Sequence, residues 1–589
     1  MVVLVRMGFG VGDRPCSIHK DTLKSSVARQ ISDLPSSLHM RLQSNVKARW
    51  ASHLGRVEVG TLFSGCEIFY DELIAIQMLL AATMSMTFEF ELTLAADNVE
   101  WKRQFTMDRH APKHCFGDVV ALAANDWVGA DYVSGKTMRV PSVHLLAAGF
   151  ECDTVSLFNT FRNKDKKDCM KLGTGKTGTT GNAALQYIAD HRVPVAILEN
   201  NKTIGSDNIQ YIVEYFNAKG FFVIHRLVDA EEYGSCSRRS RQYFVVFEIT
   251  DGSPIDQSSD LYLPPPWTQC FDDSMRSLKR TAGDPQTCLL QFMEQTPSVQ
   301  NARRDIDAKR YLDFVARSAP TEGKDNKKQK KDEEWLSIHL GVYRAHDMKW
   351  PPAIEDLDAA LYENVRHLPT RVQEAAFFHT HRPRHENIRG LPTYHDLMPN
   401  LAWLSEIRNV LPTLTCGAII FDRLNKRVLS GFESLLAQGF DLNQLLAHGR
   451  QPSNSNLMEL AGNAFNGFAV SAIVVSTLTV YPWSQAEVRA LKATSISDAA
   501  EYEEATTQEW EYHEGHRITE EQEDDEAEEE PLEEPVGQDK PLHRYHDKDN
   551  NPVDPDVQFF SVSHDTMFGP HYKDSPYYTK GDLAPFRKK

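Results

Sequence analysis

The chain has 589 residues, 41% hydrophobic and 25% charged, a composition that can bury a large core and excludes wholesale disorder. No apolar run reaches about 18 residues, which argues against a membrane-spanning helix. We expect no signal peptide, because the apolar N-terminal stretch lacks a basic leader and a cleavage site. The nine cysteines form no CxxC pair, which argues against a zinc ribbon and predicts a reducing, intracellular compartment, the nucleus if the source is eukaryotic.

The net charge of −18 is concentrated in one segment. Residues 498–534 hold 18 acidic residues and a single basic one, Arg517, whereas the rest of the chain is close to neutral. A block of like charges repels itself and buries little surface, so we expect a disordered acidic segment over 491–540, followed by a C-terminal tail over 541–589. The acidic segment either keeps the chain soluble or competes with nucleic acid for a basic groove.

Apolar strands alternate with amphipathic helices from residue 57 to residue 249. Helices are expected over 68–80 and over 206–220, the second ending at Gly220. Strands rich in Val, Ile, Leu and Phe that alternate with helices predict an α/β fold with a mostly parallel sheet covered on both faces. The last two strands are close enough in sequence for an antiparallel edge hairpin. The expected strands are 57–63, 90–97, 142–149, 193–199, 221–228 and 242–249.

This regular pattern stops near residue 250 and returns at residue 411. The intervening pieces are short and are interrupted by PPPW, by the basic cluster KDNKKQKKDEE and by WPP. We therefore expect a second, less regular domain with a flexible insertion near 320–334. The expected organisation is an N-terminal extension over 1–50, an α/β domain over 51–250 and 411–490, and the second domain over 251–410.

The residues that follow each strand are candidates for a site, because an open parallel sheet binds its ligand beyond the carboxyl ends of its strands. TLFSGCE contains Gly65, which lets the backbone turn tightly into the next helix. Asp97 ends the second strand, where a carboxylate can accept hydrogen bonds from a ribose, and FGDV offers Asp118. An Asp in such a position is more often a helix cap.

Four reactive or charged side chains fall at the ends of the later strands. Cys152 lies in the loop after one strand, Glu199 ends the next, and Arg239 and Arg241 lie two residues apart, on one face of an extended strand. A thiol, a carboxylate and two guanidiniums at one sheet edge suit attack on an electron-poor heterocycle, in which the thiolate adds and the acid holds a ring nitrogen. The alternative is that Cys152 is a small buried hydrophobe.

Taken in order, these segments resemble the motifs of the DNA (cytosine-5) methyltransferase family. TLFSG resembles the Phe-x-Gly turn, LAADNVEWKRQF the acidic second-strand end, FGDV the Gly-Asp-Ile/Val segment and AGFECDTVS the Gly-Phe-Pro-Cys-Gln loop. LENN resembles Glu-Asn-Val, and YGSCSRRSR resembles Tyr-Gly-x-Pro-Gln-x-Arg-x-Arg. LPTLTCG with KRVLSGFESLLAQGFD resembles the Arg-x-Leu-Thr segment, and ELAGNAFNGFAVSAIVV the Gln-x-Gly-Asn-Ser-Val helix. The resemblance covers 57–249 and 411–480, and the order of its parts makes it specific.

The resemblance implies a Rossmann-like class I methyltransferase fold that uses S-adenosylmethionine, with a target-recognition domain over 251–410. Cys152 would attack C6 of a cytosine flipped out of DNA, and Glu199 would hydrogen-bond N3 and the exocyclic amine. Arg239 and Arg241 would orient the base and its backbone. The resemblance implies no metal and no membrane partner, and it leaves the oligomeric state open. The cofactor would be held by Phe63, Ser64, Gly65, Asp97, Asn98, Asp118 and Asn463.

Other interpretations stay open beside this one. The chain could instead be a degenerate homologue that binds nucleic acid or cofactor without turnover, or an RNA cytosine methyltransferase. Basic residues of the second domain either contact phosphates or form a solvated face. The lysines at 324–331 are either a nuclear-import signal or a solvated loop. The arginines in question are Arg371, Arg382, Arg384 and Arg389.

The chain departs from the family pattern at three places. Glu151 stands where the family has a proline before the nucleophile, which loosens the loop and, by its negative charge, predicts a raised pKa for the Cys152 thiol. In the turn after the first strand, Glu67 would repel a cofactor carboxylate or attract its amine. The remaining departures are Cys66 and Ile68 in the same turn, Cys236 and Ser237 in place of Pro-Gln, and Asn201 in place of Val.

Overall fold

The computed structural model describes residues 31, 34–46, 56–63, 65–84, 89–156, 168–248, 266–280, 308–309, 311–313, 325–348, 358–382, 393–398, 401, 407–408, 410–440 and 452–480. The chain divides into two compact units. Apart from Pro266, all described residues belong to the unit made of residues 1–156, 164–259 and 267–483. The predicted acidic segment and C-terminal tail lie outside the described residues.

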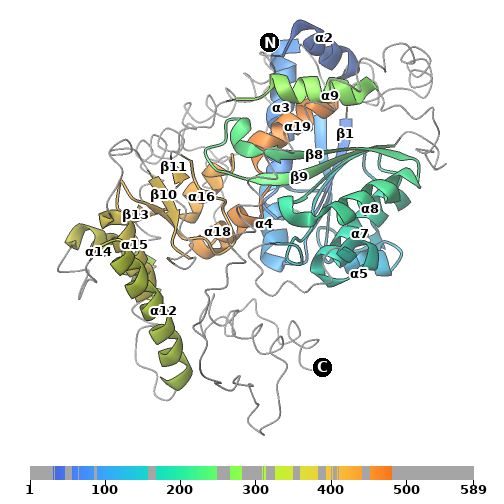
Figure 1. Cartoon of the computed structure of the whole chain (residues 1–589). Helices are drawn as coiled ribbons and strands as arrows, with labels where there is room; N and C mark the ends of the chain where they lie inside the picture. The colour runs from blue at the N-terminus through green and yellow to red at the C-terminus, as the bar shows by residue number, and fades with distance from the viewer. Residues whose placement is uncertain are drawn as a thin grey trace, which may run out of the picture. The chain divides into compact units, whose positions relative to one another are not determined.

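A seven-stranded sheet lies at the centre of the α/β part (Figure 1). Its strand order is β3-β2-β1-β6-β7-β9-β8; β9 runs antiparallel to both of its neighbours, and all other neighbouring strands are parallel. The predicted class, a mostly parallel α/β sheet with an antiparallel edge hairpin, is confirmed. The strands are β1 (Arg56–Leu62), β2 (Glu89–Ala96), β3 (His114–Phe116), β6 (Leu145–Gly149), β7 (Val195–Asn201), β8 (Phe221–Asp229) and β9 (Ser240–Glu248).

Helices cover both faces of this sheet (Figure 1). On one face, Leu146 and Phe244 of the sheet share a hydrophobic cluster with Tyr187 of α7 and Phe216 of α8. On the other face, α3 packs against α19. The strands are continuous apolar runs because both of their faces are buried in this way. The helices are α3 (Ile68–Met84), α4 (Glu100–His110), α5 (Val119–Ala124), α6 (Cys169–Leu172), α7 (Gly175–Asp190), α8 (Ser206–Asn217), α9 (Pro266–Ser277), α16 (Gly431–Ala437), α18 (Asn454–Asn463) and α19 (Gly467–Val480).

Helix α19 is buried along its whole length. Among the described residues, one helical stretch, Asn454–Val480, is apolar and long enough to cross a membrane by length and composition, and 83% of its most apolar window is buried inside the structure, as in a core helix. Part of the predicted N-terminal extension covers it. Helix α2 (Ser36–Asn45) packs against α19, buries Leu38 and Leu42, and donates a side-chain hydrogen bond from Asn45 to the Thr479 carbonyl.

A second hydrophobic cluster joins three helices to a small four-stranded sheet of order β11-β10-β12-β13. In this sheet His395 of β10 pairs with Phe421 of β12. The boundary expected at residue 410 therefore falls inside a sheet, and the domain limits themselves stay predictions. The elements are α12 (Asp325–Ala345), α14 (Ala359–Val365), α15 (Thr370–His381), β10 (Thr393–Asp396), β11 (Ile407–Arg408), β12 (Ile420–Asp422) and β13 (Arg427–Val428).

The flexible insertion expected near 320–334 is helical where the structure describes it. Residues 325–334 form the first half of α12. The expectation of a loop was wrong here, because the lysines, glutamine and glutamates of this segment are good helix formers even though their charge suggested a solvated linker.

Two histidines stack inside the small-sheet part. The rings of His379 on α15 and His395 on β10 lie 3.8 Å apart at 23°, and both side chains are buried. Burial lowers the pKa of His379 well below its ordinary value, and the neighbouring His395, Arg382 and Arg423 lower it further. His379 is therefore neutral in the folded chain at neutral pH.

We expect this part of the chain to lose stability as the pH falls below about 6.5. At such a pH an unfolded histidine binds a proton, whereas His379 in the folded chain stays neutral. The free energy of unfolding should fall by at most about 1.4 kcal/mol per pH unit for this one proton. Urea titrations followed by tryptophan fluorescence at several pH values measure the slope. His379→Phe should remove it and His381→Asn, on the same helix, should keep it; equal slopes in both variants would contradict the assignment.

Candidate active site

The predicted nucleophile, acid and arginines lie at one edge of the central sheet. β6 and β7 are parallel neighbours with Gly149 opposite Glu199, and β9 pairs Tyr243 with Glu199. Cys152 follows the carboxyl end of β6, and β9, which runs the other way, begins at the same edge. We call the ends of β6 and β7 and the start of β9 the catalytic edge, and residues 150–156 the nucleophile loop. The strand order alone brings them together.

Glu199 and Arg241 form an ion pair at the catalytic edge. Arg241 Nε lies 3.0 Å from Glu199 Oε1, and both side chains are about nine-tenths buried, with 11% and 10% exposed. Arg241 also donates from Nη1 to the Ser240 carbonyl (2.9 Å). The pair fixes the carboxylate in one place, because a charge this buried is stable only with its partner in contact.

Arg239 binds backbone carbonyls in this structure, and its expected role in orienting the base stays a prediction. Its guanidinium is buried and donates to the carbonyls of Leu414 (3.3 Å) and Gly462 (3.2 Å from each of two nitrogens). Burial, together with the charge of the nearby Arg241, lowers the pKa of Arg239 to about 10. Arg239 thus ties the catalytic edge to the segment that returns after residue 410.

The Cys152 thiol is half-buried and protonated at neutral pH. Burial raises its pKa, the Glu199 and Asp153 carboxylates raise it further, and Arg241 and Arg239 lower it. The direction matches the expectation from Glu151, but the main cause is burial. Glu151 is instead paired with Lys176 (3.5 Å between Nζ and Oε2).

Asn200 and Asn201, the last two residues of β7, connect that strand to the nucleophile loop. Asn200 donates from Nδ2 to the Phe150 carbonyl (3.0 Å). The Asn201 side chain accepts from the Thr203 amide (3.2 Å), and Thr203 donates from Oγ1 to the Val155 carbonyl (2.7 Å). Asn201, a departure from the family pattern, therefore organises the loop that carries Cys152.

The turn after β1 is where the cofactor residues were expected. Phe63 and Gly65 both have left-handed backbone (φ 58° and 55°), and the Gly65 amide donates to Asp97 Oδ2 (3.1 Å). Asp97 is buried and also accepts from the Val99 amide (2.9 Å), so in this structure it ties the turn to the end of β2. Ser64 lies outside the described residues.

Three other residues of this region can be placed. Asn98 and Asp118 are exposed at the ends of the neighbouring strands β2 and β3, and Asp118 also caps α5 by accepting from the Val120 amide (2.9 Å). Glu67 is buried and accepts from the Thr61 hydroxyl (2.7 Å), so its carboxylate is tied to β1.

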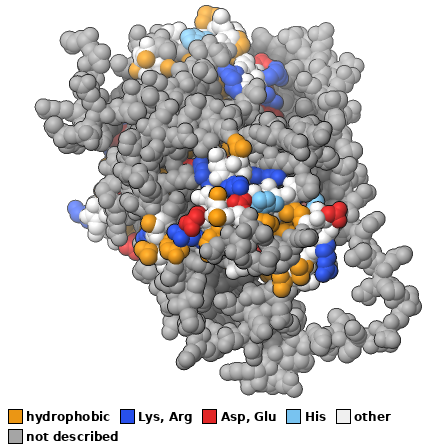
Figure 2. Space-filling model, turned by 90° about the vertical axis from the view of Figure 1, so that its left-hand side faces the viewer, with side chains coloured by type: hydrophobic (Ala, Val, Ile, Leu, Met, Phe, Trp, Pro, Cys, Tyr) orange, Lys and Arg blue, Asp and Glu red, His pale blue; other side chains and the backbone are white. Residues whose placement is uncertain are grey.

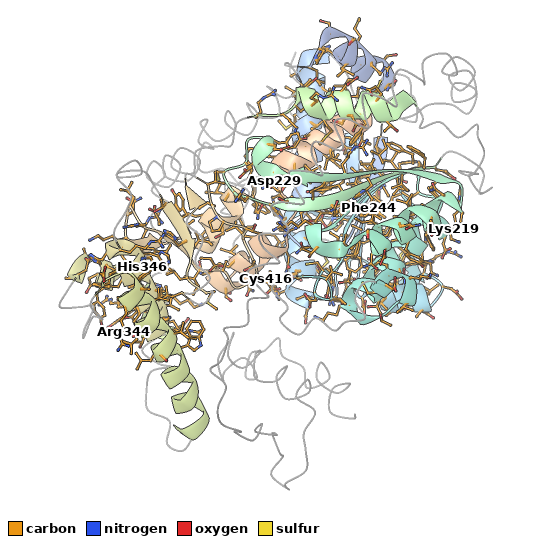
Figure 3. The ribbon with its side chains drawn as sticks, viewed as in Figure 1. Lys219, Asp229, Phe244, Arg344, His346 and Cys416 are labelled. Atoms are coloured by element: carbon orange, nitrogen blue, oxygen red, sulfur yellow. The ribbon has the colours of Figure 1, made fainter. Side chains whose placement is uncertain are left out.

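The returning segment lies against the catalytic edge. Leu411 pairs with Ser237, and Arg238 donates its amide to the Leu411 carbonyl (2.9 Å). Cys416, labelled in Figure 3, lies beside α18, and its Sγ donates to Asn463 Oδ1 (2.9 Å). The predicted cofactor residue Asn463 is exposed and close to this second thiol.

An ion pair between a buried lysine and a partly exposed glutamate, which the sequence did not reveal, joins α4 to α18. Lys102 Nζ lies 2.8 Å from Glu459 Oε1, and the Lys102 side chain is 8% exposed. Burial alone would lower the pKa of Lys102, but the Asp97 and Glu459 carboxylates outweigh burial and raise it. In the sequence Lys102 is one charge on an amphipathic helix, and no local signal distinguishes it from a solvated one.

The basic residues of the second domain pack on aromatic rings. The Arg371 guanidinium lies 4.6 Å from the centre of the Trp335 ring, and that of Arg382 lies 5.8 Å from Phe378. Arg384 and Arg389 lie outside the described residues. On the face shown in Figure 2, basic side chains are interspersed with acidic and hydrophobic ones. Contact with phosphates stays a prediction.

The residues present fit an adenosyl cofactor at the carboxyl ends of β1, β2 and β3. The left-handed turn leaves open space over Gly65, since a Cβ there would meet no atom closer than the Phe63 carbonyl at 3.9 Å. The exposed Asn98 and Asp118 offer acceptors for hydroxyl and amino groups. In the described residues no group of three His, Cys, Asp or Glu side chains could hold a metal ion.

The sheet order and the site at its carboxyl edge define a Rossmann-like class I methyltransferase fold. The chain is similar to the DNA (cytosine-5-)-methyltransferase DMT5 of Cryptococcus neoformans, with 24% identity over 505 residues that make up 80% of this chain. The family resemblance predicted from the motifs is thereby confirmed. The chain spans about a fifth (19%) of the length of that relative.

We also compared the chain with solved structures and with models of protein families. The S. pombe Dnmt2 methyltransferase is 10% identical, with a TM-score of 0.32 over 72% of this chain and 98% of that one. No family model matches the chain.

Proposed function

We propose that this chain transfers a methyl group from S-adenosylmethionine to C5 of cytosine in DNA. The observation that carries the proposal is the catalytic edge, where the Cys152 loop and the Glu199–Arg241 pair meet on neighbouring strands. The similarity to a DNA cytosine methyltransferase supports the same reaction.

In this proposal each residue acts at a stated atom of the base. The Cys152 thiolate adds to C6, and Glu199 hydrogen-bonds N3 and the exocyclic amine, which stabilises the charge that makes C5 nucleophilic. Arg241 holds Glu199 in place. After the methyl transfer, solvent water takes the C5 proton and the C6–S bond breaks with its electron pair returning to sulfur, which restores the C5–C6 double bond. S-adenosylmethionine, held by Phe63, Gly65, Asn98, Asp118 and their neighbours, supplies the methyl group. The base must leave the duplex, since a stacked cytosine cannot present C6 to a thiol.

A second candidate is a module that binds nucleic acid and cofactor without turnover. It is favoured by one observation, the burial of Cys152, which raises the pKa of its thiol and keeps the thiolate scarce.

Methyl transfer from tritiated S-adenosylmethionine to nucleic acid tests the proposal. We expect label in duplex DNA, recovered as 5-methylcytosine after nuclease digestion. Label confined to structured RNA would replace DNA by RNA as the substrate. Cofactor binding without transfer to either would establish the binding module.

A further inference from the structure

The nucleophile loop docks onto the first turn of α7. The Thr154 amide donates to Thr177 Oγ1 (3.1 Å), and the Thr177 amide donates to Thr154 Oγ1 (3.2 Å). This reciprocal pair joins residues 23 positions apart in the chain. Thr174, at the N-cap position of α7, makes no side-chain cap, so the loop itself caps the helix through Thr154.

The two segments approach closely because of a glycine. A Cβ on Gly175 would lie 2.5 Å from Thr154 Oγ1 and 3.0 Å from Thr154 Cγ2. Gly175 also has left-handed backbone, with φ 64°. Any other residue at 175 would push Thr154 away from the helix.

Lys176 adds a second connection between the same two segments. Its Nζ lies 2.8 Å from Asp153 Oδ2 and 3.5 Å from Glu151 Oε2, so one ammonium group contacts the carboxylates on both sides of Cys152. Lys176 and Asp153 are more than half exposed, and such ion pairs contribute little to stability. Thr177, by contrast, is completely buried.

We propose that the first turn of α7 positions Cys152, with Thr177 as the principal positioning residue and Lys176 as an auxiliary one. The turn anchors the loop through two hydrogen bonds and two ion pairs, on both sides of Cys152. The consequence for the reaction rests on the proposed function; the anchoring itself does not.

Thr177→Val tests the anchor because it removes only the hydroxyl. We expect the Thr154 amide to exchange hydrogen at least about tenfold faster, because its acceptor is gone. Iodoacetamide should alkylate Cys152 faster in the free protein, since a released loop exposes the thiol. Methyl transfer should nevertheless fall by about 10- to 100-fold in kcat, with KM for S-adenosylmethionine unchanged, because the thiol is misplaced.

Matched variants separate positioning from general damage. Thr177→Ser keeps the hydroxyl, so amide exchange, alkylation and methyl transfer should all proceed at the wild-type rates. Thr180→Val removes another buried hydroxyl of α7, one that donates only to the Lys176 carbonyl of its own helix, and should leave them unchanged. Lys176→Met should slow methyl transfer by only about two- to fivefold, because an exposed ion pair contributes little. Lys171→Met is its control and should leave the transfer rate unchanged.

The possible results are distinct. Unchanged exchange and alkylation in Thr177→Val would overturn the anchor. Faster exchange with unaltered transfer would overturn its role in the reaction. If the wild-type chain transfers no methyl group, the proposed function fails, and the exchange and alkylation rates still decide whether α7 positions the thiol.

Discussion

We expect the wild-type chain to form a covalent complex with a duplex containing 5-fluorocytosine in the presence of S-adenosylmethionine, and we expect Cys152→Ala to form none. The adduct needs a bond from sulfur to C6, and fluorine at C5 blocks the elimination that would release it. The fold should survive, with a loss of about 1 kcal/mol, because the side chain is small and half-buried. Denaturing gel electrophoresis measures the adduct.

The pH dependence gives this prediction a second measurement. Because burial raises the pKa of Cys152, the rate of adduct formation should still increase with pH above about 8.5, where an ordinary thiol is already half ionised. Cys270→Ala, which removes a thiol from α9, serves as the control and should form the adduct normally. A folded wild-type chain that binds the cofactor and yields no adduct would favour the binding module.

Changing Glu199 to glutamine should move two rates in opposite directions. Methyl transfer should fall by about 10²- to 10⁴-fold, the usual contribution of a positioned proton donor or acceptor. Alkylation of Cys152 by iodoacetamide at fixed pH should become faster, because the Glu199 carboxylate raises the pKa of the thiol and Arg241 lowers it. Both rates are measured on the purified chain, the second without DNA or cofactor.

The chain offers a matched control for this change. Glu248 lies at the far end of β9 and pairs with Arg192 (2.7 Å), so Glu248→Gln breaks a similar ion pair away from the catalytic edge. We expect it to leave both rates within about twofold of the wild type. If Glu199→Gln slowed alkylation as well as transfer, it would have distorted the loop instead.

The central sheet could be predicted because strands buried on both faces appear as plain apolar runs. The assembly of Cys152, Glu199 and Arg241 followed from the same prediction, since the carboxyl ends of the parallel strands β6 and β7 share an edge and the antiparallel strand β9 begins at that edge. The hairpin of β4 (Val128–Asp131) and β5 (Lys136–Arg139) was missed, because its strands are short and largely polar.

What the sequence could not show depends on contacts between distant segments. The Arg239 guanidinium binds carbonyls of residues 175 and 223 positions further along the chain, contacts that the prediction of its role at the base did not include. Glu151 was expected to act on Cys152 through its own charge, yet Lys176, on a helix that begins well after the loop, contacts that charge. No periodicity or motif encodes either contact.

The pairing of Ser237 with Leu411 brings the two ends of a long intervening stretch side by side. Between them the chain first passes through β9, which belongs to the catalytic edge, and then makes an excursion through α9, α12, α14, α15, β10 and β11 before it returns at Leu411. The entropy cost of bringing the two ends of such an excursion together rises only slightly with its length. A change in the length of the chain after β9 should therefore leave the catalytic edge in place, provided that β9 and the pairing of Ser237 with Leu411 are kept.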